Sequence, residues 1–168
     1  MQLLALTAKN SQYIYKGILA SRSSVFAAMF EHDMEERKQN KVKITDVDHK
    51  VVQEMLTYIY TDTSPNLKDM ADDLLIVANK YDLERLKFMC EEFLCSKITR
   101  ENAVSMLILA DQHNADCLKA YAINFISANA SYFLTTPSIW EKSISLLSGS
   151  PLLIVEVNRA IFASKESV

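Results

Sequence analysis

The chain has 168 residues, a formal net charge of −3 and a hydrophobic content of 49%, which suffices to bury a core as one domain or as two small ones. Its two glycines, Gly17 and Gly149, lie far apart, which excludes glycine-rich nucleotide-binding loops because those need closely spaced glycines. The slightly acidic balance argues against a nucleic-acid partner, and the lack of an apolar run of about 18 residues argues against a membrane span.

The first part of the chain is predicted to hold a small sheet and an interrupted helix. Residues 3–16 are predicted as a hairpin, because two short β-favouring runs flank a Lys-Asn-Ser turn. Residues 18–30 have a helical period with a break at Ser-Arg-Ser-Ser, where Ser23 or Ser24 is a suitable N-cap. Val42 and Ile44 alternate with lysines, which predicts a short strand.

The period is helical throughout the rest of the chain. Asp48 is predicted to cap a helix that runs to Tyr60. Further helices are predicted over residues 70–81, 83–96, 103–113, 117–129, 138–147 and 151–163. The first 98 residues are therefore predicted to be helices with a small sheet, and the remainder a small all-helical part.

The residues that could carry catalysis do not form a recognisable constellation. Asp72 and Asp73 are neighbours on a helix, so their side chains point about 100° apart and are interpreted as solvated carboxylates in a first helical turn. Tyr58, Tyr60 and Tyr81 have helical spacing and are interpreted as core packing. We therefore expect a binding or scaffold module, not an enzyme, with no cofactor and no metal.

The three cysteines, Cys90, Cys95 and Cys117, form no C-x-x-C motif. A zinc site could be drawn from them with His113, but the spacing matches no known zinc module, so buried free thiols are predicted. The odd number of cysteines argues against a disulfide framework, and the apolar N-terminus lacks the basic segment of a signal peptide. Both observations favour the nucleus or cytoplasm as the location.

Residues 16–30 read Lys-Gly-Ile-Leu-Ala-Ser-Arg-Ser-Ser-Val-Phe-Ala-Ala-Met-Phe. Between a hairpin and a charged loop, this segment resembles the H-K-x-[IV]-L-[AS]-[AS]-R-S-x-x-F-x-x-[ML]-F motif of BTB/POZ domains. The chain also resembles the speckle-type POZ group of that family through Pro-Asn-Leu at 65–67, Met-Ala-Asp-Asp-Leu-Leu at 70–75 and Leu-Ile-Leu-Ala-Asp at 107–111. The resemblance covers about Leu3 to Ala163.

The resemblance implies a fold in two parts. Residues 1–98 would form an α+β BTB/POZ domain, which is mainly α with a small β-sheet. Residues 99–168 would form an all-α region that contains a 3-box, at about Glu101 to Ile126, and part of a BACK domain.

The resemblance also implies a function, because proteins of this group are substrate adaptors that dimerise and bind cullin-3 in cullin-RING ubiquitin ligases. The implied cullin-binding residues are Met34, Glu36, Tyr60, Tyr81, Leu107 and Asp111, and Ile18 matches a dimer-interface position. Met34-Glu35-Glu36 stands where the group has its apolar-x-Glu motif, in the charged loop before the predicted strand. Burying an exposed methionine in a partner pocket would supply about 1.5–3 kcal/mol, although Met34 packing on its own domain is the alternative.

The chain departs from the pattern at several places. Tyr15 stands where the family motif begins with histidine, and Gly17 where alanine is usual. Asp62 stands where relatives end a helix with glycine, and aspartate tolerates left-handed backbone. The N-terminal dimer helix and the substrate-binding MATH domain of the group have no counterpart in this sequence, so we expect a weakened homodimer or a heterodimer with BTB paralogues, and the ubiquitination substrate stays unknown.

Four functional alternatives stay open at this point. The first is a cullin-3-binding adaptor that promotes protein ubiquitination. The second is a BTB oligomerisation or scaffold module without a ligase role. The third is a short form that modulates full-length paralogues by pairing with them or by occupying cullin-3. The fourth, which the residues favour least, is an uncharacterised enzyme on a helical scaffold.

Overall fold

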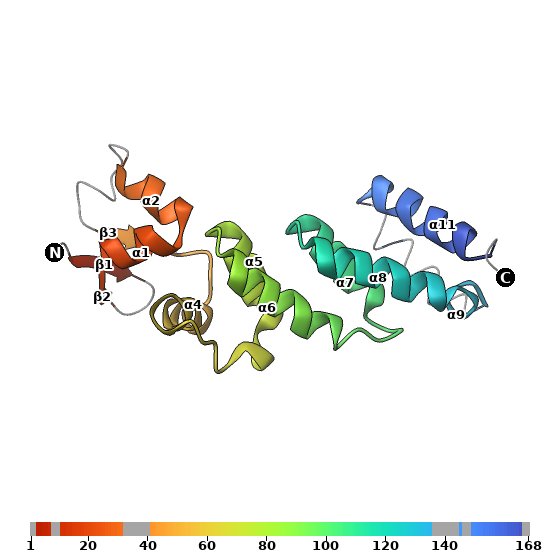
Figure 1. Cartoon of the computed structure of the whole chain (residues 1–168), viewed down its shortest axis with the longest axis horizontal. Coiled ribbons are helices and arrows are strands. Elements are labelled where there is room, and N and C mark those ends of the chain that lie inside the picture. The colour runs from red at the N-terminus through yellow and green to blue at the C-terminus, as the bar shows by residue number, and fades with distance from the viewer. Residues whose placement is uncertain (1–2, 8–10, 32–40, 136–144, 146–148, 166–168) are drawn as a thin grey trace. The chain divides into compact units, whose positions relative to one another are not determined.

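The computed structural model describes residues 3–7, 11–31, 41–135, 145 and 149–165 (Figure 1). The chain divides into two compact units, Met1–Cys90 and Glu91–Val168. In the described residues the first unit combines helices with one small sheet, whereas the second unit is helical throughout.

The sheet of the first unit has three strands in the order β2-β1-β3. Strand β1 (Leu3–Thr7) pairs antiparallel with β2 (Ser11–Tyr15), with Leu3 opposite Tyr15, and parallel with β3 (Lys41–Lys43). The predicted hairpin strands and the short strand near Val42 are thus confirmed. The predicted turn residues Lys9 and Asn10 lie outside the described residues.

The interrupted helix is also confirmed, as α1 (Lys16–Arg22) and α2 (Ser24–Glu31). Ser23 between them is extended and buried, and its hydroxyl oxygen accepts a hydrogen bond from the Phe26 N–H at 3.2 Å. The same hydroxyl donates to the Tyr81 carbonyl oxygen at 2.5 Å. Ser23 therefore caps α2 and ties the break between the helices to a distant part of the chain.

Gly17 gives a direct test of helix propensity at the start of α1. It does not have a positive φ, and a Cβ atom added to it would meet nothing within 4 Å. We expect Gly17→Ala to raise the free energy of unfolding by about 0.5–1 kcal/mol, because alanine loses less backbone entropy on entering a helix. Urea denaturation of both proteins measures the change, and an unchanged or lower midpoint for the variant would contradict this expectation.

The remaining helices of the first unit are α4 (His49–Thr61), the 3-10 helix η1 (Leu67–Asp69), α5 (Ala71–Lys80) and α6 (Glu84–Cys95), in which the division between the units falls. The Asp48 carboxylate accepts from the Lys50 N–H at 2.8 Å, so the predicted cap is confirmed. Asp62 ends α4 with φ 56° and ψ 16°, the left-handed conformation expected where relatives carry glycine. Asp72 and Asp73 lie in the first turn of α5, as predicted.

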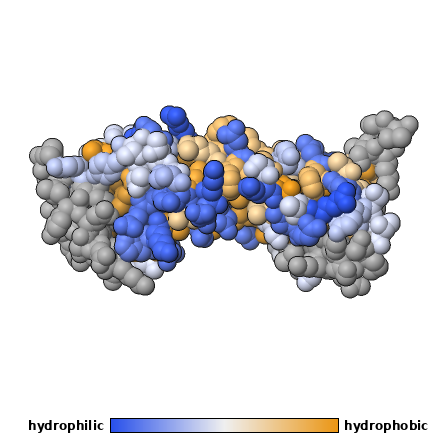
Figure 2. All heavy atoms as spheres, turned by 90° about the horizontal axis from the view of Figure 1, so that it is seen from below, coloured by the Kyte–Doolittle hydropathy of each residue, from blue (hydrophilic) through white to orange (hydrophobic). Residues whose placement is uncertain are grey.

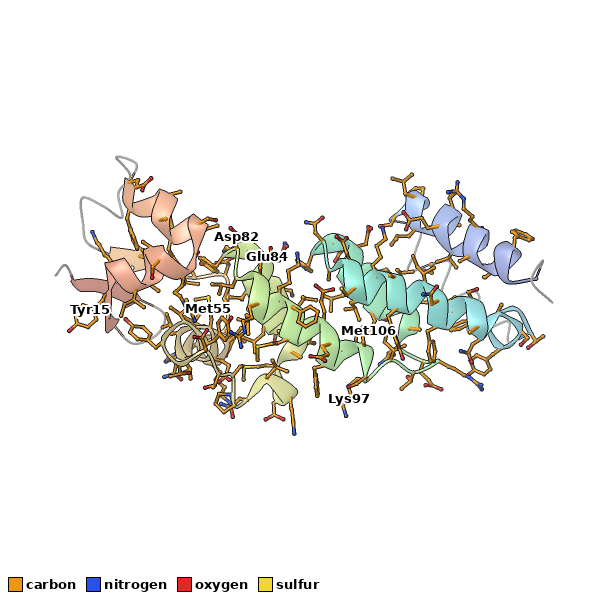
Figure 3. All side chains as sticks on the ribbon, in the orientation of Figure 1. Tyr15, Met55, Asp82, Glu84, Lys97 and Met106 are labelled. Atoms are coloured by element: carbon orange, nitrogen blue, oxygen red, sulfur yellow. The ribbon has the colours of Figure 1, made fainter. Side chains whose placement is uncertain are left out.

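The core of the first unit is built from side chains of several of these helices. Met55, labelled in Figure 3, is fully buried on α4. The other fully buried large side chains of this unit are Leu19, Phe26, Leu74, Leu75 and Leu86.

The second unit contains α7 (Ala103–Gln112), α8 (Asp116–Ala128), α9 (Ala130–Thr135) and α11 (Pro151–Lys165). One core joins all four helices, with Leu107 of α7, Ile126 of α8, Phe133 of α9 and Leu153 of α11 buried together. Helix α9 is an addition to the sequence prediction, whereas most of the predicted helix over residues 138–147 lies outside the described residues. In the described part of the chain, no helix is long and apolar enough to cross a membrane.

Candidate functional site

The predicted cullin-binding residues fall into three groups in the structure. Met34 and Glu36, the proposed apolar-x-Glu motif, lie outside the described residues. Tyr60 and Asp111 present side-chain surface to solvent, whereas Tyr81 and Leu107 are buried inside their own units. Ile18, the predicted dimer-interface residue, is half-buried on α1.

Tyr60 lies in the last turn of α4 and is 43% exposed. Its hydroxyl oxygen accepts a hydrogen bond from the backbone N–H of Tyr15 at 3.1 Å, at the end of β2. This bond fixes the tip of the side chain, and the exposed part of the ring is left as a rigid aromatic surface. The interpretation of Tyr60 as core packing is therefore wrong, although Tyr58 and Tyr81 are buried as that interpretation required.

Tyr81 performs an internal role. Its ring stacks on Phe26 with centroids 4.7 Å apart, and only 3% of the residue is exposed. Burial, with a smaller contribution from the Asp46 carboxylate, raises the pKa of Tyr81 to about 12, so the phenol is neutral at physiological pH. A side chain in this position has no surface for a partner, and the same holds for Leu107, which is fully buried.

Asp111 takes part in an ion-pair network of the second unit. Lys119 on α8 lies 2.8 Å from the Asp111 carboxylate on α7 and 3.0 Å from the Glu156 carboxylate on α11. The hydrogen bonds to Asp111 and then to Glu156 raise the pKa of Lys119, so the lysine stays charged between them. About a third of the Asp111 side chain is exposed, which leaves one face of the carboxylate open to a partner.

Glu54 is a buried carboxylate that the sequence analysis did not single out. Its two oxygens accept hydrogen bonds from the Ser64 hydroxyl at 2.7 Å and from the backbone and side-chain amides of Asn66, both at 2.9 Å. Burial opposes ionisation of Glu54, but the hydrogen bonds from Ser64 and Asn66 outweigh it and hold its pKa below the usual value. Glu54 thereby fastens the loop after α4 to that helix.

The first unit has two open, polar cavities, one of them beside Glu54. One has a volume of about 560 Å³ and lies between α4 and the η1 region, with Glu54 and Met70 in its wall. The other has a volume of about 280 Å³ and is lined by the ion pair between Arg22 and Asp62 and by Asp82 and Glu84, which Figure 3 labels. Hydrophilic and hydrophobic side chains are interspersed over the molecular face shown in Figure 2.

The cysteines differ from one another in exposure, which corrects the prediction of three buried thiols. Cys90 is buried, Cys95 is half-buried, and Cys117, in the first turn of α8, is exposed. Within the described ranges, no group of three or more His, Cys, Asp or Glu side chains is arranged to hold a metal ion.

Comparison with known proteins defines the class. The BTB/POZ domain family model matches residues 3–98, more than half of the chain. The chain therefore belongs to the BTB/POZ family, whose domains serve related proteins as oligomerisation modules or as cullin-3 adaptors.

Among solved structures, the chain is similar to the BTB (Tramtrack and Bric a brac) domain of human gigaxonin. The two are 24% identical over 54% of this chain and 74% of that chain, with a TM-score of 0.46.

Proposed function

We propose that this chain is a non-enzymatic, substrate-adaptor-type BTB protein of the speckle-type POZ group that binds cullin-3 and so promotes protein ubiquitination. Membership of the BTB/POZ family over residues 3–98 carries the proposal. Further support comes from the helices that follow, because α7 and α8 occupy the segment in which the group has its 3-box.

The contact that we propose centres on Met34 and Glu36 of the charged loop. Met34 would enter an apolar pocket of cullin-3, and Glu36 would fix the register through a hydrogen bond. The exposed ring of Tyr60 and the open face of Asp111 are suited to further contacts. Because Tyr81 and Leu107 are buried, we assign them the supporting role of holding their neighbours in place.

Met34→Asp tests the proposal. We expect the affinity for the cullin-3 N-terminal domain to fall about tenfold or more, because the variant loses the burial of one methionine side chain and places a charge in an apolar pocket. Isothermal titration calorimetry measures the change, and circular dichroism verifies that the fold is retained.

Met70→Asp provides a matched control for this test. Met70 is half-buried and occupies the N-cap position of α5, where aspartate is favoured. This variant should bind cullin-3 as the parent does. Unchanged affinity of a folded Met34→Asp protein would refute the motif assignment.

The same calorimetry separates the adaptor from an oligomerisation module without a ligase role. A parent chain that self-associates in sedimentation experiments but does not bind cullin-3 would favour the oligomerisation module. A pull-down with a full-length BTB paralogue would identify a form that acts by pairing with such a protein.

A further inference from the structure

Two cysteines of the second unit occupy neighbouring helix ends. Cys95 is the last residue of α6, and Cys117 is the second residue of α8. Cys95 is half-buried and Cys117 is exposed, and both are free thiols. Neither is used in the proposed contact with cullin-3.

A hydrogen bond links the two helix ends on which these cysteines lie. Glu91 on α6 is 5% exposed, and its carboxylate accepts from the Leu118 N–H at 3.0 Å. Leu118 directly follows Cys117, whereas Cys95 lies four residues after Glu91 and therefore on the same face of α6. The Glu91 carboxylate thus holds the first turn of α8 against the helix face that carries Cys95.

The electrostatics of Cys95 agree with this arrangement. Burial is the largest cause that raises the pKa of the Cys95 thiol, and the Glu91 carboxylate and the Cys117 side chain raise it further. Cys95 is therefore held as the neutral thiol.

We propose that Cys95 and Cys117 form a reversible redox pair that reacts with small disulfides of the glutathione class. Cys117 is exposed, so its thiolate attacks the small disulfide first, which forms a mixed disulfide and releases one glutathione thiol. Cys95, after losing its proton, then attacks the Cys117 sulfur and expels the second glutathione as a thiol. The two cysteines together lose two hydrogens and two electrons, and glutathione disulfide is reduced to two glutathione molecules.

Treatment of the full chain with glutathione disulfide, followed by mass spectrometry, tests this proposal. We expect a product lighter than the reduced protein by two hydrogens, with one cross-linked peptide pair that contains Cys95 and Cys117, and reversal by dithiothreitol. Cys95→Ser should stop at a glutathione adduct on Cys117, whereas Cys117→Ser should give no internal disulfide. Cys90→Ala should still form the cross-link, because that thiol is buried.

Two results would overturn the proposal. One is a wild-type protein that ends as a stable glutathione adduct on Cys117 while Cys95 stays reduced. The other is a disulfide between Cys117 residues of two copies, seen as a dimer on a non-reducing gel. Circular dichroism of the serine variants separates a lost reaction from a lost fold, and neither result bears on cullin-3 binding.

Discussion

Leu107→Ala is expected to lower the free energy of unfolding of the second unit by about 2–5 kcal/mol. Leu107 is fully buried, with 0% of the residue exposed, in the core that includes Ile126 and Leu153. Truncation removes apolar burial and leaves a cavity that the surrounding helices only partly fill. Urea denaturation followed by far-ultraviolet circular dichroism measures the loss.

Two further substitutions on α7 serve as comparisons for Leu107→Ala. Ser105 is exposed on α7, so Ser105→Ala should change stability by no more than about 0.5 kcal/mol. Asp111→Asn keeps the core intact and removes the charge of the half-buried carboxylate that pairs with Lys119, so it tests partner contact without cavity formation. A Leu107→Ala protein as stable as the Ser105→Ala protein would show that Leu107 is not a core residue.

The features that the sequence predicted well depend on a few adjacent residues. The cap at Asp48, the left-handed Asp62 and the helix break at Ser23 follow from the chemistry of single side chains and their near neighbours. BTB membership was predictable because the motif at residues 16–30 is long and ordered. These features can be predicted from a single sequence because they do not depend on contacts between distant parts of the chain.

The features that the sequence did not predict depend on distant contacts. The hydrogen bond from Ser23 to the Tyr81 carbonyl joins residues 58 positions apart, and nothing local distinguishes a buried Tyr81 from an exposed Tyr60. Helical spacing makes all such tyrosines equivalent until the packing of other helices is known. For the same reason, Leu107 could be placed at a partner interface by resemblance although it lies in the core.

The role of Glu54 could not be predicted from its neighbours in the sequence either, and its substitution gives the second large expected effect on stability. Its triplet Val52-Gln53-Glu54 matches the apolar-x-Glu pattern by chance, yet the carboxylate is buried on α4 and bound by Ser64 and Asn66. We expect Glu54→Gln to lower the free energy of unfolding by about 1.5–3 kcal/mol at neutral pH. Glutamine replaces one accepting oxygen with an amide that faces hydrogen-bond donors, so the loop after α4 loses part of its attachment.

The free energy of unfolding that Glu54→Gln loses should become smaller as the pH falls. Because the folded pKa of Glu54 lies below its ordinary value of 4.5, the folded state holds the proton more weakly than the unfolded state does. The stabilisation is therefore complete above the unfolded pKa and disappears as pH falls through the folded pKa. Urea denaturation at neutral pH and in acid should show the difference between parent and Glu54→Gln shrinking towards low pH.

Gln53→Ala is the matched control for this pH dependence, because Gln53 is exposed on the same helix and carries no charge. Its difference from the parent should stay small and constant across the same pH range. A Glu54→Gln difference that was equally constant would mean that the charge of Glu54 contributes nothing to folding. The loss in Glu54→Gln would then come only from the accepting oxygen that glutamine lacks, because Ser64 and Asn66 donate to both oxygens of Glu54.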